Sequence, residues 1–122
     1  MKPKYQLKVK IKVSKIVNDL KEELKDLPVA ELAEMKVNPE LIRYVCNIVE
    51  GQIKKKYKCN KKDIVTSILL KLNPAITEAD KKTINDVVEY LHSNGDIVAV
   101  YAAKYVGNLL VRLLKLTVGI VL

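Results

Sequence analysis

The segment from Asn38 to Ile53, NPELIRYVCNIVEGQI, decides the fold predicted for this chain. Asn38 followed by Pro39 is a start signal for a helix, because an asparagine side chain caps free backbone N–H groups and proline suits the first helical position. We expect the helix to reach about Tyr57. Apolar residues recur in it at helical spacing and predict one buried stripe, formed by Leu41, Ile42, Val45, Ile48, Val49 and Ile53.

Upstream of this segment the sequence predicts two further helices. Ser14 can cap a helix that runs from Lys15 to about Asp26. Pro28 ends that helix and opens a short one from Val29 to Met35. The apolar residues of the first helix share one face, and we expect it to be buried: Ile16, Leu20, Leu24 and Leu27.

Downstream of the segment two more helices are predicted, each opened by a cap. Asn60 precedes a helix over 61–72, and Thr77 precedes one that ends near Ser93. Asn94-Gly95 is typical of a helix C-terminus or a tight turn. The inward residues are expected to be Ile64, Val65, Ile68, Leu69, Leu72, Ile84, Val87, Val88 and Leu91.

The N-terminus has a different periodicity. Every second residue is apolar, at Tyr5, Leu7, Val9, Ile11 and Val13. Gln6 and lysines lie between them, and several of the apolar residues are β-branched. This alternation is typical of a strand with one apolar face and one lysine-coated face, so we expect a strand over 1–13 that needs a partner strand.

The C-terminal segment, Ile97 to Leu122, reads IVAVYAAKYVGNLLVRLLKLTVGIVL. Two interpretations stay open: a helix to about Leu113 followed by a strand, or one continuous helix. Its polar residues form one narrow stripe, at Lys104, Asn108, Arg112 and Lys115. The remaining apolar arc is wider than a small monomer covers, so we expect another molecular surface to cover it. The predicted interface residues are Val106, Leu109, Leu110, Leu113 and Leu114.

Together these elements predict a single domain over 1–122, which is enough chain for one core. The predicted fold class is mainly α (α+β): about five helices in a helical region over 14–96, with strands in 1–13 and in the apolar segment 97–122. The two terminal strands are expected to pair with each other or with neighbouring chains.

Twenty-two basic residues against 14 acidic ones give a net charge of +8. The excess gathers in two clusters, and the predicted basic patch consists of Lys8, Lys10, Lys12, Lys54, Lys55 and Lys56. Such clusters attract phosphates, acidic proteins or anionic lipid headgroups. The alternative is solvated lysine that keeps an apolar protein in solution. Because nearly all the basic residues are lysine rather than arginine, sequence-specific recognition of nucleic acid is disfavoured.

No catalytic or metal-ligating pattern is found in the sequence. Cys46 and Cys59 fit no zinc spacing, and His92 is the only histidine. The carboxylates between Asp19 and Asp26 alternate with lysines at helical spacing, which favours a salt-bridged surface over acid–base chemistry. We therefore predict no enzyme, no metal, no cofactor and no small-molecule substrate. Free cysteines indicate a reducing compartment, and the lysine-rich start does not resemble a secretory leader.

One resemblance is found in the middle of the chain. Tyr44-Val45 and Val49-Glu50 lie on one expected helix, a lysine-rich turn follows, and Thr77-Glu78-Ala79-Asp80 opens a later helix. In these features about Asn38–Asp96 resembles the cytosolic helical region of small tailed-phage holins of the LL-H type. Those holins resemble one another in an N-terminal transmembrane helix, whereas this chain begins with a lysine-faced segment. The resemblance implies a phage origin and a small helical module.

The function predicted from these features is a non-enzymatic structural or assembly protein of a tailed-phage virion, assembled in the host cytoplasm. Its partners are expected to be other virion proteins or copies of itself, bound through the apolar C-terminal segment, with non-specific contact to nucleic acid or anionic lipid. One alternative is a holin-like, membrane-associated phage protein at the host inner membrane surface. The other is a non-specific nucleic-acid-associated protein, since Tyr57 lies within the lysine run.

Overall fold

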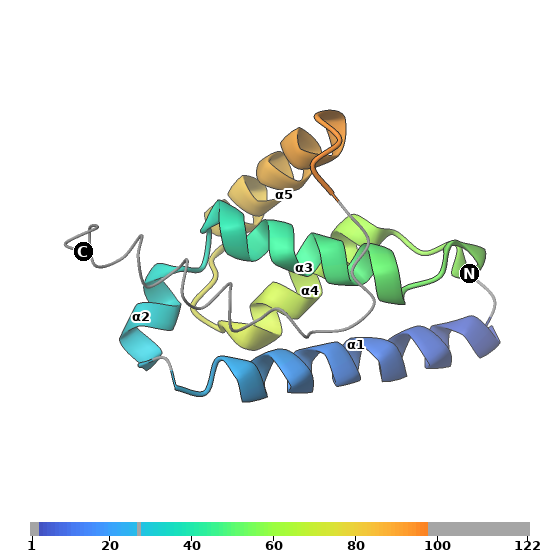
Figure 1. The fold of residues 1–122 in the computed structure, drawn as a ribbon, viewed down its shortest axis with the longest axis horizontal. Coiled ribbons are helices and arrows are strands. Elements are labelled where there is room, and N and C mark those ends of the chain that lie inside the picture. Colours follow the sequence, from blue (N-terminus) through green and yellow to red (C-terminus); the bar gives the residue numbers. More distant parts are fainter. Residues whose placement is uncertain (1–2, 27, 98–122) are drawn as a thin grey trace.

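Helix α4 lies in the middle of the structure and contacts α1, α3 and α5 (Figure 1). The computed structural model describes residues 3–26 and 28–97. The elements in chain order are α1 (Pro3–Glu23), α2 (Val29–Glu34), α3 (Pro39–Gln52), the 3-10 helix η1 (Lys55–Tyr57), α4 (Lys61–Leu72) and α5 (Glu78–Ser93). In Figure 1, α1 runs along one side of the bundle and α5 lies on the opposite side of α3 and α4.

The predicted α+β class is wrong: over residues 3–26 and 28–97 the structure contains helices and no strand. Residues 3–13 of the predicted N-terminal strand over 1–13 belong to α1, which runs through Ser14 without a break. The second predicted strand falls within 98–122, outside the described residues.

The alternating N-terminal pattern is also compatible with a helix. Val9 and Val13 are one turn apart and buried, whereas Leu7 and Ile11 are 63% and 60% exposed on another face of α1. The inward stripe then continues at helical spacing through Ile16, Val17, Leu20 and Leu24, all of which are buried. A strand would have placed the four apolar residues from Leu7 to Val13 on a single face. Packing of one long stripe against α4 therefore outweighs the strand preference of the β-branched residues.

Local signals set the later helix boundaries largely as predicted. The Asn38 side chain accepts hydrogen bonds from the backbone N–H groups of Glu40 and Leu41, and Asn60 does the same for Lys62 and Asp63. Thr77 and Asp80 form a reciprocal capping box. At the other end of α5, Gly95 has a φ of 67°, and the N–H of Asp96 donates to the carbonyl of Leu91, which closes the helix as Asn94-Gly95 indicated.

The helix that begins at Asn38 is shorter than predicted. α3 ends at Gln52 rather than near Tyr57, and Ile53 is its C-cap. The chain then forms η1, and Lys58 adopts a left-handed conformation with a φ of 50°. The Ile53 and Tyr57 side chains are both buried at this bend. The bend turns the lysine-rich segment back toward the N-terminal part of α1, which η1 contacts.

Residues of α1, α3, α4 and α5 supply one shared core of aliphatic side chains. Its most fully buried members are Ile16, Leu20, Ile42, Ile48, Ile53, Ile68, Leu69, Ile84, Val45 and Val49. The residues that we predicted to be inward on α3, α4 and α5 are buried, except that Val87 is only partly so. The core therefore fixes the position of α1 and of η1 relative to each other.

The two faces of α1 give a direct test of its helical packing. Leu20→Ala removes a fully buried side chain and should lower the free energy of unfolding by about 2–5 kcal/mol. Leu7→Ala, on the exposed face, should change it by less than about 0.5 kcal/mol. Urea denaturation measures both values. An equally large loss for Leu7→Ala would contradict the arrangement.

Candidate functional site

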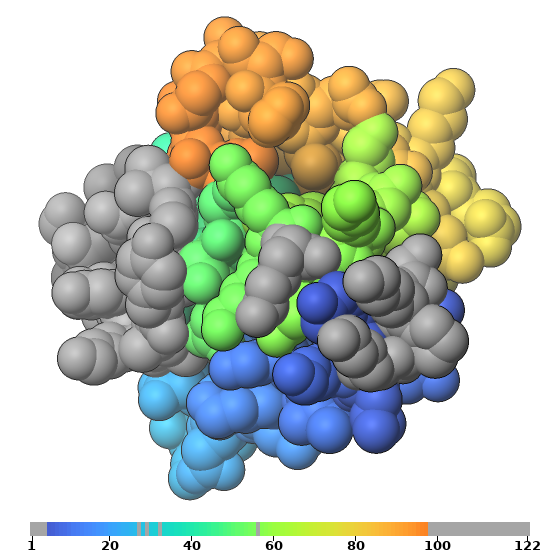
Figure 2. Space-filling model, turned by 90° about the vertical axis from the view of Figure 1, so that its right-hand side faces the viewer, coloured from blue at the N-terminus to red at the C-terminus, as the bar shows by residue number. Residues whose placement is uncertain are grey.

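The structure brings parts of the two lysine clusters together at one end of the molecule. Lys8, Lys10 and Lys12 lie on α1, and Lys54, Lys55 and Lys58 lie in and around η1. The Tyr5 and Tyr57 rings join the two segments, with centroids 5.0 Å apart and an interplanar angle of 43°. Figure 2 shows the first part of α1 and the segment after α3 side by side on this face. We call these six lysines the basic end.

Carboxylates neutralise one part of the second cluster and leave the other part free. Lys61 of α4 pairs with Glu50 of α3 at 3.2 Å, and Lys62 pairs with Glu89 of α5. Among the described residues no carboxylate forms an ion pair with any lysine of the basic end. Five of these lysines are exposed and Lys12 is half-buried. Six described lysines without an ion pair are therefore gathered at the basic end.

Tyr57, the one aromatic residue in the lysine run, serves the fold instead of the surface. Tyr57 is only 5% exposed, and its ring contacts that of Tyr5 in a tilted arrangement. A ring held in this way offers no free face on which a nucleic-acid base could stack. The basic end therefore presents charge without the aromatic platform that single-stranded nucleic acids use.

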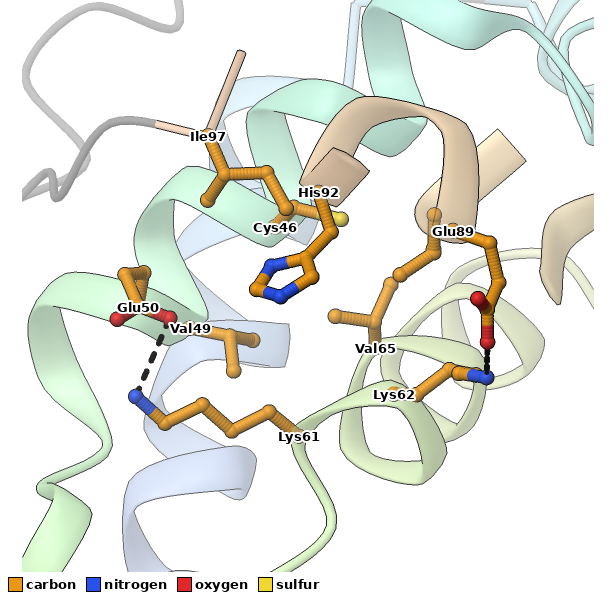
Figure 3. A pocket seen from close by; sticks show the side chains of 10 residues that line it. Cys46, Val49, Glu50, Lys61, Lys62, Val65, Glu89, His92 and Ile97 are labelled. Carbon is orange, nitrogen blue, oxygen red and sulfur yellow. Dashed lines mark hydrogen bonds and ion pairs between the residues drawn. The ribbon is translucent and has the colours of Figure 1, made fainter. Parts of the chain in front are cut away.

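A pocket of about 230 Å³ lies between α3, α4 and α5. Its interior is apolar, with Cys46, Val49, Val65, Val88 and Ile97 among its lining residues. Figure 3 shows the two ion pairs of Lys61 and Lys62 on opposite sides of the pocket, with the His92 ring between them. The volume is below that of typical ligand sites, and each lysine on the rim already has its carboxylate. Its size and paired charges suit one or two apolar side chains.

The chemistry of the pocket does not provide a nucleophile. Burial raises the pKa of the Cys46 thiol to about 12, and the nearby Glu50 carboxylate also raises it, so the reactive thiolate is suppressed. Among the described residues no cluster of His, Cys, Asp or Glu is suited to hold a metal ion. Nothing in the described part of the chain points to an enzymatic activity.

Two acidic residues of α1, Asp19 and Glu22, form ordinary surface ion pairs, as the spacing of charges predicted. Lys15 lies 3.3 Å from Asp19, and Lys25 lies 2.7 Å from Glu22. The Lys25–Glu22 hydrogen bond raises the pKa of Lys25, which keeps that ammonium charged. A different carboxylate has a structural role: hydrogen bonding to the Thr77 backbone N–H, together with Lys36, lowers the pKa of Asp80 to about 2 at the start of α5.

Only some of the predicted site residues lie in the part of the chain that the structure describes. Five of the six lysines predicted for the basic patch belong to the basic end, and the sixth, Lys56, lies in η1. The predicted interface residues from Val106 to Leu114 lie outside the described residues. Leu7 and Ile11, which we expected on an apolar strand face, are instead exposed on α1. The signal that could have found this exposure is the continuation of the Val9–Val13 spacing to Ile16 and Leu20.

Comparisons of the chain with protein-family models, with curated proteins and with solved structures find no match. The resemblance of about Asn38–Asp96 to LL-H-type holins therefore stays a prediction. Within residues 3–26 and 28–97, no helix combines the length and apolar character needed to cross a membrane.

The two cysteines should differ sharply in reactivity. Cys46 is 3% exposed, and with a pKa of about 12 only ~10⁻⁴ of it is thiolate at pH 8, whereas Cys59 is partly exposed. In the native protein a maleimide should label Cys59 first and Cys46 only after unfolding. Mass spectrometry of Cys46→Ala and Cys59→Ala measures each site separately. Rapid labelling of Cys46 in the folded Cys59→Ala variant would contradict the assignment.

Proposed function

We propose that this chain is a non-enzymatic assembly protein of a tailed phage. It joins other molecules through two separate surfaces: the basic end, which binds an anionic surface, and the apolar segment 97–122, which packs against neighbouring protein subunits. The observation that carries the first part is the gathering of unpaired lysines from α1 and η1 at one end of the fold. The second part rests on the sequence of 97–122.

The positions of the lysines that lack an ion pair favour a binding surface over a role in solubility alone. Lysines that only keep a protein in solution need no particular position, whereas here most of the described lysines without an ion pair gather at the basic end, and only Lys21, Lys71 and Lys82 lie elsewhere. Lys61 and Lys62 pair with carboxylates of α3 and α5, whereas Lys54, Lys55 and Lys58, in and around the segment that contacts α1, have no ion pair among the described residues. Unpaired like charges held close together gain the most when an anionic partner arrives.

Nucleic acid is the less favoured partner for this surface. The basic residues of the basic end are all lysines, which lack the planar fork that reads bases and phosphates with fixed geometry. The neighbouring aromatic residues, Tyr5 and Tyr57, contact each other. Contact with packaged nucleic acid would therefore be purely electrostatic and strongly dependent on salt.

The phage context of the proposal rests on the resemblance of about Asn38–Asp96 to the helical region of LL-H-type holins and on a lysine- and isoleucine-rich composition. The assembly part rests on the apolar arc that includes Val106, Leu109, Leu110, Leu113 and Leu114. Removing such an arc from water contributes about 25 cal/mol per Å² of apolar area, which favours association with other subunits.

The basic end can be tested with two variants of equal charge. Lys8→Gln/Lys54→Gln/Lys55→Gln removes three charges from the basic end, and the control Lys21→Gln/Lys71→Gln/Lys82→Gln removes three from exposed lysines elsewhere. Elution from a heparin column measures anion binding. The first variant should elute at clearly lower salt than the control, although the two proteins have the same net charge. Co-elution of the two would show that the basic end is not a binding surface.

The assembly role predicts that the full chain forms particles heavier than one 13.8 kDa copy, measured by light scattering. Leu109→Ser/Leu113→Ser should reduce that mass, because two predicted interface residues become polar. The control Asn108→Ser/Arg112→Gln changes the polar stripe and should preserve the mass. A full-length protein that stays a single soluble copy at high concentration would overturn the assembly role.

A further inference from the structure

The outward face of α1 combines exposed apolar side chains with lysines. Leu7 and Ile11 are 63% and 60% exposed, and they lie one helical turn apart on the same face. Among the described residues the only other large apolar side chain with comparable exposure is Tyr90, on α5. A single exposed apolar residue is ordinary, but two adjacent ones on one helix face form a small apolar patch. The core does not need this patch, since the opposite face of α1 fills it.

The charges around the patch have one sign. From helix geometry, Lys8 lies on one flank of the Leu7–Ile11 pair and Lys10 on the other. From Pro3 to Asn18, α1 contains no acidic residue. The segment after α3, which contains Lys54 and Lys55, lies at the same end of the molecule, because η1 contacts α1 there (Figure 2). The apolar patch is therefore flanked on α1 by Lys8 and Lys10, which have no ion pair among the described residues.

We propose that this face of α1 docks on an anionic lipid bilayer, with Leu7 and Ile11 inserted at the boundary between headgroups and acyl chains. The lysines of the basic end bind the lipid phosphates around them. The inference rests on the basic end of the proposed function and names the class of anionic surface that it binds.

The shape and charge of the patch favour a bilayer over other occupants. A second copy of the chain would bring its own lysines against these lysines, and like charges repel. An acidic protein would need carboxylates and also a hollow shaped to accept two side chains that project from a convex helix. A bilayer surface needs no matching shape, because headgroups move aside for apolar tips while lysine ammonium groups remain at the phosphate level. Apolar insertion and electrostatic attraction together provide the two signals that stable membrane attachment requires.

The absence of tryptophan from the sequence gives a direct probe of insertion. In the full chain, Leu7→Trp or Ile11→Trp introduces a single indole on the proposed face, and Tyr90→Trp introduces one at a matched exposed position on α5. Vesicles of phosphatidylcholine with phosphatidylglycerol should shift the emission of the two α1 indoles to the blue, and soluble polyglutamate should not. The Tyr90→Trp emission should stay unchanged. A blue shift equal for all three positions, or one produced equally by polyglutamate, would overturn the proposal.

Vesicle sedimentation measures how strongly the protein binds to vesicles. All the variants retain segment 97–122, so differences between them do not come from binding by that segment. Leu7→Ser/Ile11→Ser should weaken partition onto anionic vesicles at least about ten-fold, whereas Tyr90→Ser should not. Lys8→Gln/Lys54→Gln/Lys55→Gln should weaken it about 100-fold relative to the Lys21/Lys71/Lys82 control. Helical circular dichroism checks that each variant is folded.

The outcomes distinguish this inference from the proposed function. If only the lysine substitutions weaken binding, the basic end stands as an anion-binding surface and the insertion of α1 is overturned. If neither set weakens binding to vesicles or to heparin, the basic end itself is overturned. Weakening by both sets, together with the blue shift, supports docking of α1.

Discussion

The position of α4 between three other helices is the constraint on which the rest of the structure depends. Its apolar residues pack against α1, α3 and α5 at once. The bundle therefore has one shared core instead of separate contacts between pairs of helices. The first turn of α4 adds two ion pairs, from Lys61 to Glu50 and from Lys62 to Glu89. Partly exposed ion pairs of this kind add little stability. They do determine which lysines between Lys54 and Lys62 have their charge neutralised. Lys61 and Lys62 at the start of α4 are neutralised, whereas Lys54, Lys55 and Lys58 before it have no ion pair within the described part of the chain.

Packing of α1 against α4 also decides which apolar residues the protein displays. The inward stripe from Val9 to Leu24 fills the core, so the remaining apolar residues, Leu7 and Ile11, must face away. The same packing places the N-terminal part of α1 beside η1, where Tyr5 meets Tyr57. The exposed apolar patch and the gathered lysines are thus two results of one arrangement. Both features require α1 to be a continuous helix.

Sequence patterns predicted α3, α4 and α5 well because each is preceded by a capping side chain and carries apolar residues whose spacing fits a helix and not a strand. The N-terminus lacked such a signal. Apolar residues at every second position from Tyr5 to Val13 satisfy a strand on one face, and they satisfy a helix if Leu7 and Ile11 are exposed. Ser14, taken as a cap, lies inside α1 and is exposed. The composition of the basic patch could be predicted from the sequence, whereas its assembly from two segments could not. That juxtaposition depends on the bend after Ile53 and on tertiary contacts between η1 and α1.

Burial of Tyr57 links the fold to the choice of partner. A lysine run with an exposed ring would suit single-stranded nucleic acid, which binds through stacking as well as charge. Here the ring packs against α1, so the run contributes charge alone, and the exposed large apolar groups of α1 are the aliphatic Leu7 and Ile11. Aliphatic side chains gain little from contact with bases but gain from any environment that removes them from water. A surface that offers lysine ammonium groups around a small aliphatic patch is therefore better matched to lipid than to nucleic acid, and the Tyr5–Tyr57 contact is the structural cause of that preference.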